Sequence, residues 1–347
     1  MPLWPSGKVR PWYLMPTRTR SRVQIAAGAY FFPMLSEISH HIRTHLSSFS
    51  ADDKIIFNSS LLPCNPAHFS QLVPASASKT IAFIDGGQAD IISAGNFCLS
   101  FIRVGAVLFQ ADQKVGYEKK EFYLFTKARY AEKDLFYESI IFPVGSEVQI
   151  DVQDLAISST DSSIRIGLER APITAVTTMA RRFAELKLAA SIKADYVILD
   201  GILEPTLKNE EKYILQLPSS VSALAKTCSL FTTSGNNPIV LLNKMGGLGC
   251  WTYHVENKTY FVKLHESAKH VFRFEGNAGA LSYLVNNSRD ALFLGYPYGL
   301  ILADKLARVS NEEKKSLRMN FLLRKENKEI LNYLNASNAH EILDEMG

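Results

Sequence analysis

Hydrophobic and polar positions follow one another along this chain in blocks that predict a mixed α/β fold. The clearest block is the apolar run TIAFI at residues 80–84, which is typical of a strand buried on both faces. We expect this strand to stop at Asp85, because two glycines follow at once. A second run, DYVILDGIL at 195–203, predicts another buried strand, which ends in an Asp-Gly step at Asp200.

The remaining blocks predict a strand meander followed by alternating helices and strands. Segments 96–110 and 120–130 favour two strands joined by a turn over 114–119. Apolar residues at three- and four-residue spacing predict a long helix over 173–192. Further helices are predicted at 217–231, 277–286, 298–309 and from 311 onward, and further strands at 258–265 and 270–275. This order indicates an α/β protein with a mixed sheet.

The N-terminal part differs from this pattern. Residues 1–33 are basic, acid-free and without periodicity, so we predict a disordered leader and interpret it as an extension upstream of a natural start at Met34. An apolar stripe predicts a helix from Met34 to about residue 46. A polar stretch over 47–78 then links this helix to the first buried strand.

Composition places the chain among soluble globular proteins. Its 347 residues are 47% hydrophobic and 21% charged. No apolar stretch reaches the roughly 18 residues that span a bilayer, so we expect no membrane partner. The four cysteines are scattered without a CxxC pair, which favours a reducing, cytoplasmic location over a disulfide scaffold or a zinc ribbon.

The net charge of +4 gives no argument for nucleic-acid binding by the body of the chain. Without the five basic residues of the leader, 33 basic and 34 acidic residues remain. Binding to DNA would therefore depend on local patches of positive charge.

Acidic side chains supply the candidate chemistry. Asp85 and Asp200 end strands, and strand ends of one sheet meet at one edge; Glu185 and Asp304 lie on predicted helices. Carboxylate oxygens suit Mg²⁺ or Mn²⁺, and two such ions activate water and stabilise the leaving oxygen in phosphodiester hydrolysis. The alternative is structural: each Asp-Gly step is an ordinary turn, and Asp304 pairs with Arg308 one helical turn away.

Four motifs in order, AFIDGG, RRFAELKLAA leading into YVILDGIL, ALAKT and GYPYGLILADKLA, resemble the NurA nuclease family over about residues 79–310. The resemblance implies an RNase H-like mixed β-sheet flanked by helices, with residues 311–347 as additional C-terminal helices. It also implies Mn²⁺-dependent (or Mg²⁺-dependent) cleavage of single-stranded DNA and duplex ends. This cleavage would be 5′ to 3′ exonuclease and single-strand endonuclease activity in double-strand break repair. A homodimer and a hexameric HerA-type ATPase as partner are implied as well.

The same resemblance implies roles for individual residues. Asp85, Glu185 and Asp200 stand at the family's acids, and Tyr296 stands at the tyrosine of a late YP motif. Asp304 stands where the family often carries histidine; we expect activity to survive this departure, with an altered metal preference and pH profile. Residues with these carried-over catalytic or metal-binding roles are Asp85, Glu185, Asp200, Tyr296 and Asp304.

Basic residues near the acids are candidates for binding the DNA backbone: Lys226, Arg181, Arg182, Lys187, Lys305 and Arg308. The alternatives stay open at this point. Glu185 and Lys226 could be solvated helix residues, Glu169 competes with Glu185 for its role, and Tyr296 could only pack beside Pro297. For the whole chain, the alternatives are an actin-like or sugar-kinase-like ATPase, which ATP-dependent thermal stabilisation would favour, and a non-catalytic interaction subunit.

Overall fold

The structure is a computed structural model that describes residues 34–46, 53–76, 78–228, 230–291 and 293–337. The predicted leader at 1–33 lies outside the described residues. The chain divides into two compact units, one of residues 1–63 with 231–236 and one of residues 64–230 with 237–347.

The first unit contains the predicted N-terminal helix, which spans residues 34–46, and a hairpin. Strands β1 (Lys54–Phe57) and β2 (Ser60–Pro63) form this hairpin, and β1 also bridges to Thr232. Asp53 is buried there and accepts hydrogen bonds from the hydroxyls of Thr232 and Ser234. The segment 231–236 is thereby joined to the hairpin by main-chain and side-chain hydrogen bonds.

The second unit is built on one large mixed sheet. Its strands are β3 (Phe69–Gln71), β4 (Thr80–Ala94), β5 (Phe97–Gln110), β6 (Gln113–Ala131), β7 (Asp134–Val144), β8 (Ile157–Ser158), β9 (Tyr196–Asp200), β10 (Val221–Ala225), β11 (Trp251–Glu256), β12 (Thr259–Lys263) and β13 (Phe272–Glu275). They lie in the order β3-β11-β12-β13-β10-β9-β4-β5-β6-β7-β8. Only the pairs β4–β9 and β9–β10 are parallel among these neighbours.

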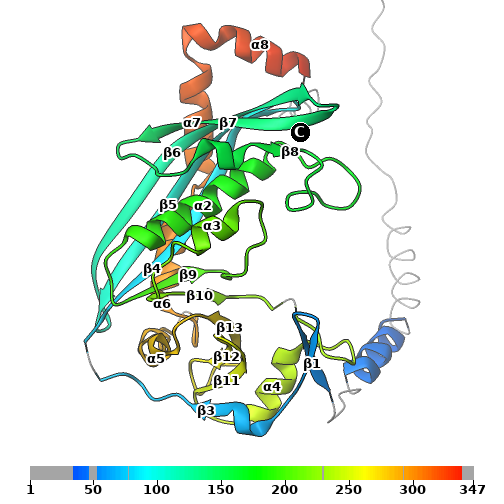
Figure 1. Ribbon diagram of the computed structural model, residues 1–347, viewed down its shortest axis with the longest axis vertical. Coiled ribbons are helices and arrows are strands. Elements are labelled where there is room, and N and C mark those ends of the chain that lie inside the picture. Colours follow the sequence, from blue (N-terminus) through cyan, green and yellow to red (C-terminus); the bar gives the residue numbers. More distant parts are fainter. Residues whose placement is uncertain (1–33, 47–52, 77, 229, 292, 338–347) are drawn as a thin grey trace, which may run out of the picture. The chain divides into compact units, whose positions relative to one another are not determined.

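Helices cover both faces of this sheet (Figure 1). They are α2 (Ala175–Ser191), α3 (Glu210–Ile214), α4 (Pro238–Gly246), α5 (Leu281–Asn287), α6 (Tyr298–Ala307), α7 (Asn311–Leu322) and α8 (Lys328–Ser337). A meander of antiparallel strands followed by parallel strands, with helices on both faces, confirms the expected RNase H-like mixed α/β sheet. In the described part of the chain, every helix is too short or too polar to span a bilayer.

Strand β4 is buried on both faces, as its unbroken apolar run predicts. Ala82 and Ile84 point into the core beneath α2 and α3, whereas Ile81 and Phe83 point into the core beneath α5 and α6. This alternation is the two-residue period of a strand, and it fixes the face to which each later residue of β4 points.

The prediction that this strand stops at Asp85 is wrong. β4 continues to Ala94 and stays paired with β5 beyond Asp85. The two glycines are required by close neighbours rather than by a turn. A Cβ at Gly86 would lie 2.4 Å from a carboxylate oxygen of Glu185, and one at Gly87 would lie 2.2 Å from the carbonyl oxygen of Ala307.

Two other sequence predictions also need correction. Segment 217–231, predicted as a helix, contains β10, whose residues are all buried between β9 and β13. The neighbouring strands supply the backbone hydrogen bonds here, and tertiary context overrides local propensity. The turn before β6 lies at residues 111–112 instead of 114–119, so β6 is longer than expected.

The C-terminal helices attach to the outer part of the meander. Arg103 of β5 forms ion pairs with Glu121 of β6, at 2.6 Å, and with Glu313 of α7, at 2.5 Å. Side chains of α7 and α8 pack against a small apolar cluster that includes Ile91 and Phe101. Both contacts join α7 to β5 and to the part of β4 that follows Asp85.

Candidate active site

Asp85 and Asp200 lie next to each other on the sheet because their strands run parallel. Ile84 of β4 is the register partner of Leu199 of β9, so the next pair along these strands is Asp85 and Asp200. Ile198 points to the face covered by α5 and α6, and so do Asp200 and Asp85 by the two-residue period. Two acids that are more than a hundred residues apart in sequence therefore share one face at one level of the sheet.

The surroundings of Asp85 disfavour its charged form. Burial, reinforced by the negative charges of Asp200 and Glu185, raises the pKa of Asp85 to about 7. A hydrogen bond from the Gly86 amide to its carboxylate, at 2.7 Å, and the charge of Lys226 act in the opposite direction. Burial is the larger cause of the raised pKa, and the smaller contributions of Asp200 and Glu185 place three carboxylates close enough to interact, as expected of a site that attracts a cation.

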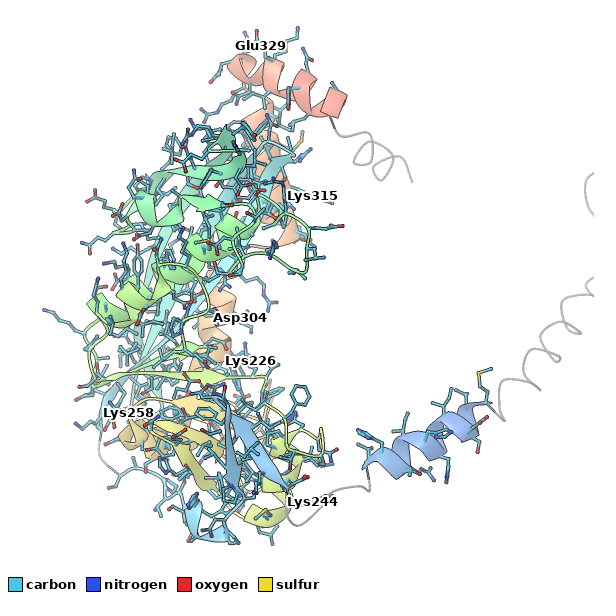
Figure 2. All side chains as sticks on the ribbon, turned by 45° about the vertical axis from the view of Figure 1, so that its right-hand side comes forward. Lys226, Lys244, Lys258, Asp304, Lys315 and Glu329 are labelled. Carbon is cyan, nitrogen blue, oxygen red and sulfur yellow. The ribbon has the colours of Figure 1, made fainter. Side chains whose placement is uncertain are left out.

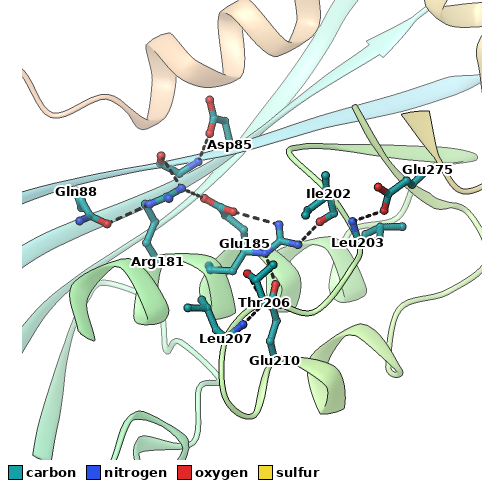
Figure 3. Close-up of polar contacts among 12 residues, drawn as sticks. Asp85, Gln88, Arg181, Glu185, Ile202, Leu203, Thr206, Leu207, Glu210 and Glu275 are labelled. Carbon is teal, nitrogen blue, oxygen red and sulfur yellow. Dashed lines mark hydrogen bonds and ion pairs between the residues drawn. The ribbon is translucent and has the colours of Figure 1, made fainter. Parts of the chain in front are cut away.

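Glu185 reaches this site from the opposite face of the sheet. It is buried on α2, and its carboxylate approaches β4 where Gly86 leaves room for it. Burial raises its pKa, while Arg181, with which it forms an ion pair, and Arg182 lower it in part. Figure 3 shows Arg181 between Glu185 and the side chain of Gln88, to which it donates a hydrogen bond at 3.1 Å.

Arg182 is held inside the protein. Its guanidinium donates to the buried carboxylate of Glu210 at 2.7 Å and to the carbonyl oxygen of Ile202 at 2.5 Å. Glu210 also accepts hydrogen bonds from the amides of Thr206 and Leu207, so it anchors the loop after β9 (Figure 3). Arg182 thus links α2 to the segment that follows Asp200. Glu210 was not among the predicted site residues, since nothing in the sequence EEKY at 210–213 distinguishes a buried acid from a solvated one.

Lys226 follows β10 and neutralises Asp200. Its ammonium lies 2.5 Å from the Asp200 carboxylate and 5.4 Å from the centre of the Tyr296 ring. Burial lowers the pKa of Lys226, but the hydrogen bond and charge of Asp200 outweigh burial and raise it overall. Lys226 is therefore a fixed positive charge beside the acids, at the end of a strand instead of on the predicted helix.

Tyr296 is buried just before α6. Burial, with the negative charges of Asp200, Asp85 and Asp304, raises its pKa, so its hydroxyl stays protonated. Among the described residues, this hydroxyl has no hydrogen-bond partner. A buried donor without a partner is costly, and at a functional site it is a group that a ligand can satisfy.

Asp304 lies on α6 at the rim of the site, close to Lys226 (Figure 2). It forms the predicted ion pair with Arg308, at 2.5 Å, one helical turn away. Arg308 and Lys305 are exposed. Glu169, the alternative to Glu185, lies exposed in the loop before α2, whereas Glu185 interacts electrostatically with both aspartates. The structure therefore brings Asp85, Glu185, Asp200, Lys226 and Tyr296 together, with Asp304 at their edge.

The donor chemistry of this site fits a hard divalent cation. Its acids offer carboxylate oxygens, and a bound cation would offset the burial and the repulsion that together raise the pKa of Asp85. In this conformation Asp200 is paired with Lys226 and Glu185 with Arg181. Consistent with these ion pairs, no three His, Cys, Asp or Glu side chains within the described ranges are spaced to hold a metal ion.

The sheet order and the paired strand acids define an RNase H-like fold with a carboxylate site. Searches of protein-family models and of curated protein sequences find no match.

Solved structures with a similar arrangement are nucleases. The NurA nuclease from Sulfolobus solfataricus aligns with a TM-score of 0.49 and 13% identity, over 86% of this chain and 98% of that one. Endonuclease V from Ciona intestinalis, in complex with an inosine-containing DNA, aligns with a TM-score of 0.39 and 12% identity, over 71% and 92% of the two chains. Human endonuclease V aligns with a TM-score of 0.34 and 11% identity, over 72% and 94%. These similarities are too distant to assign an activity to this chain.

Proposed function

We propose that this protein is a metal-dependent DNA nuclease that hydrolyses phosphodiester bonds. The observation that carries the proposal is the register of β4 and β9, which places Asp85 and Asp200 side by side, with Glu185 entering from the other face through the gap at Gly86. Clustered carboxylates with a raised pKa are costly to a protein that does not use them.

Asp85 and Asp200 would hold Mn²⁺ or Mg²⁺, with Glu185 and Asp304 as further ligands. The chemistry that such an ion supplies is Lewis-acid activation of the attacking water and of the phosphodiester. The backbone of β4 fixes the orientation of Asp85 through the hydrogen bond from the Gly86 amide. Burial raises the pKa of Glu185, and the charges of Arg181 and Arg182 oppose this rise in part.

Positive groups around the acids would receive the DNA backbone. Lys226 carries a charge next to Asp200, and exposed Arg308 and Lys305 extend the positive surface along α6. An ammonium or guanidinium that leaves its carboxylate for a phosphate exchanges one charge-assisted hydrogen bond for another. Arg181 lies on the opposite side of β4 and is also partly accessible. Arg182 is bound to Glu210 inside the protein, and we propose that it positions the loop after β9 and does not bind DNA.

The finer features of the activity belong to the same proposal. Digestion of single strands and duplex ends with 5′ to 3′ polarity, a role in double-strand break repair, a homodimer and a HerA-type ATPase partner rest on the motif resemblance at AFIDGG, YVILDGIL and GYPYGLILADKLA. The sequence has no phosphate-binding GK[ST] loop of its own, so DNA translocation is assigned to the partner.

The test uses end-labelled single- and double-stranded DNA with Mn²⁺, with Mg²⁺ and with EDTA. We expect metal-dependent shortening of the DNA by the wild-type protein and by Asp112→Asn, an exposed control in the turn between β5 and β6. We expect no shortening of the DNA by Asp85→Asn or Asp200→Asn, although both variants should be at least as thermally stable as the wild-type protein. Cleavage that survives either substitution would refute the site.

Complete inactivity, also in the presence of a HerA-type ATPase, would refute the nuclease. Thermal stabilisation of the inactive protein by Mg-ATP would then support the kinase-like alternative. Retention of the ATPase partner's function with Asp85→Asn would instead support a non-catalytic subunit.

A further inference from the structure

A pocket of about 400 Å³ opens beside the acids, and its residues His270, Phe272 and Phe293 have no role in the proposed hydrolysis. Its walls come from β10, β13, the segment before α6 and α6 itself. Lys226 and Asp304, which lie close together in Figure 2, mark the side of the pocket that faces the acids. The volume is within the range of pockets that bind small organic groups.

Four of the eight residues that line this pocket carry aromatic rings. The rings of His270 and Phe293 stack with their centres 5.2 Å apart and their planes inclined by 19°, and both residues are exposed. Phe272 and Tyr296 are buried beneath them, with ring centres 5.3 Å apart. An exposed phenylalanine, 42% accessible, beside a buried aromatic floor leaves flat apolar surface facing solvent.

The polar groups at the pocket connect it to the acids. Tyr296 lines the pocket and interacts electrostatically with Asp200 and Asp85, and its buried hydroxyl has no partner within the described residues. Lys226 lies over the face of the same ring and is bound to Asp200. Tyr296 and Lys226 thus lie between the pocket and Asp200, and Asp304 lines the pocket itself.

We propose that this pocket binds a nucleobase of the DNA strand under cleavage, at the nucleotide next to the scissile phosphate. The proposal rests on the nuclease function. Aromatic rings offer a stacking surface to any base, and Lys226 and Arg308 at the rim carry the charge that attracts the adjoining phosphates. A lipid chain would not need these cations, and a free phosphate would not need the rings.

This arrangement assigns distinct roles to the rings and to the hydroxyl. The exposed face of Phe293 stacks on the base, and the Tyr296 hydroxyl donates a hydrogen bond to the sugar-phosphate of the same nucleotide. Because every base has an apolar face, the pocket fixes the position of the strand without selecting its sequence. The enzyme would therefore require a base at one position and tolerate any base there.

The test places the fluorescent base 2-aminopurine at successive positions of short single-stranded oligonucleotides, which bind the full-length protein in EDTA at fixed ionic strength. We expect stacking to quench the fluorescence at one position only. Phe293→Leu, which keeps an apolar side chain but removes the ring, should abolish that quenching and weaken binding about tenfold. Phe142→Leu, at an exposed phenylalanine of β7, is the matched control and should change neither.

Cleavage of oligonucleotides with a single abasic nucleotide separates this proposal from the nuclease itself. We expect the abasic nucleotide to slow cleavage about tenfold at the position that 2-aminopurine identifies. If the wild-type protein cleaves DNA but quenching is absent at every position, or persists in Phe293→Leu, the base pocket is refuted and the nuclease stands. If no DNA is cleaved, the nuclease fails, and position-specific quenching still decides whether the pocket holds a base.

Discussion

Two Asp-Gly steps that look alike in the sequence solve different physical problems in the structure. At Asp200, β9 ends, and Gly201 adopts a φ of +117° in open space. At Asp85, β4 continues for nine more residues to Ala94, and the glycines that follow are in contact with α2 on one face and the end of α6 on the other. Gly201 is needed because its backbone conformation favours glycine. Gly86 and Gly87 are needed because neighbouring atoms leave no room for a side chain.

This difference shows that an acid followed by glycine can lie at the end of a strand, like Asp200, or within one, like Asp85. Asp200 is the last residue of β9, and the chain turns away from the sheet at Gly201. Close approach of helices surrounds Asp85 in mid-strand, which explains why burial is the main cause of its raised pKa.

Asp85→Asn and Asp200→Asn should each reduce DNA cleavage by roughly 10³-fold or more, because the two carboxylates act as one unit. Single-turnover cleavage of labelled DNA in Mn²⁺ measures this, with Asp112→Asn as the control. A large loss in one variant and a small one in the other would show that the two strand acids are not equivalent.

Gly87→Ala should destabilise the protein by about 3 kcal/mol or more, because its Cβ would meet the backbone of α6, which cannot turn away as a side chain can. Gly201→Ala should cost only about 1–2 kcal/mol, the strain of a left-handed backbone, since no atom lies within 4 Å of the added Cβ. Urea unfolding of both variants compares them. Equal losses would contradict the distinction between the two steps.

Asp85→Asn should stabilise the metal-free protein, and more so at high pH. The folded-state pKa of Asp85, about 7, lies above its ordinary value of 3.8. Its contribution to stability is thus complete below about pH 4 and is lost as the pH rises through 7. Asparagine does not titrate and still accepts the Gly86 amide.

Thermal unfolding in EDTA at pH 5 and pH 8 measures this effect. The advantage of Asp85→Asn over wild type should grow by about 2 kcal/mol between these pH values. An advantage that is independent of pH would mean that Asp85 titrates normally.

Arg308→Gln should change stability by no more than about 0.5 kcal/mol, because its ion pair with Asp304 lies on an exposed helix face, outside both strand ends. The midpoint of urea unfolding is the measurement. A loss comparable to that of Gly201→Ala would indicate that the rim of α6 is part of the structural core.

The sequence predicted the elements whose pattern depends on burial alone. The apolar runs of β4 and β9, the spacing of α2 and the late helices all follow from periodicity. β10 was mistaken for a helix because VSALA has no two-residue alternation when both faces are buried. β7, β8 and β11 were not predicted, since these strands of mixed polarity lie at or next to the edges of the sheet and acquire their structure from their neighbours.

The positions of Asp200 and Glu185 were predictable because a strand end and a helix can be read from sequence, whereas the predicted strand end at Asp85 was wrong. The meaning of the glycines at 86–87 was not predictable, since their neighbours lie about a hundred and about two hundred residues further along the chain. The aromatic pocket was missed for the same reason: His270, Phe272, Phe293 and Tyr296 lie in two separate segments with no shared motif.

The uninterrupted pairing of β4 past Asp85 also limits the motion of the main chain at this residue. Asp85, Gly86 and Gly87 are all paired with β5, so the main chain that carries Asp85 moves only if the ladder opens. Asp200 is the last residue of its strand and is paired with Leu224 of β10, so its main chain can reorient when this terminal pair opens and the rest of the sheet stays intact. One carboxylate is therefore a stationary reference point, and the other is the adjustable member of the pair.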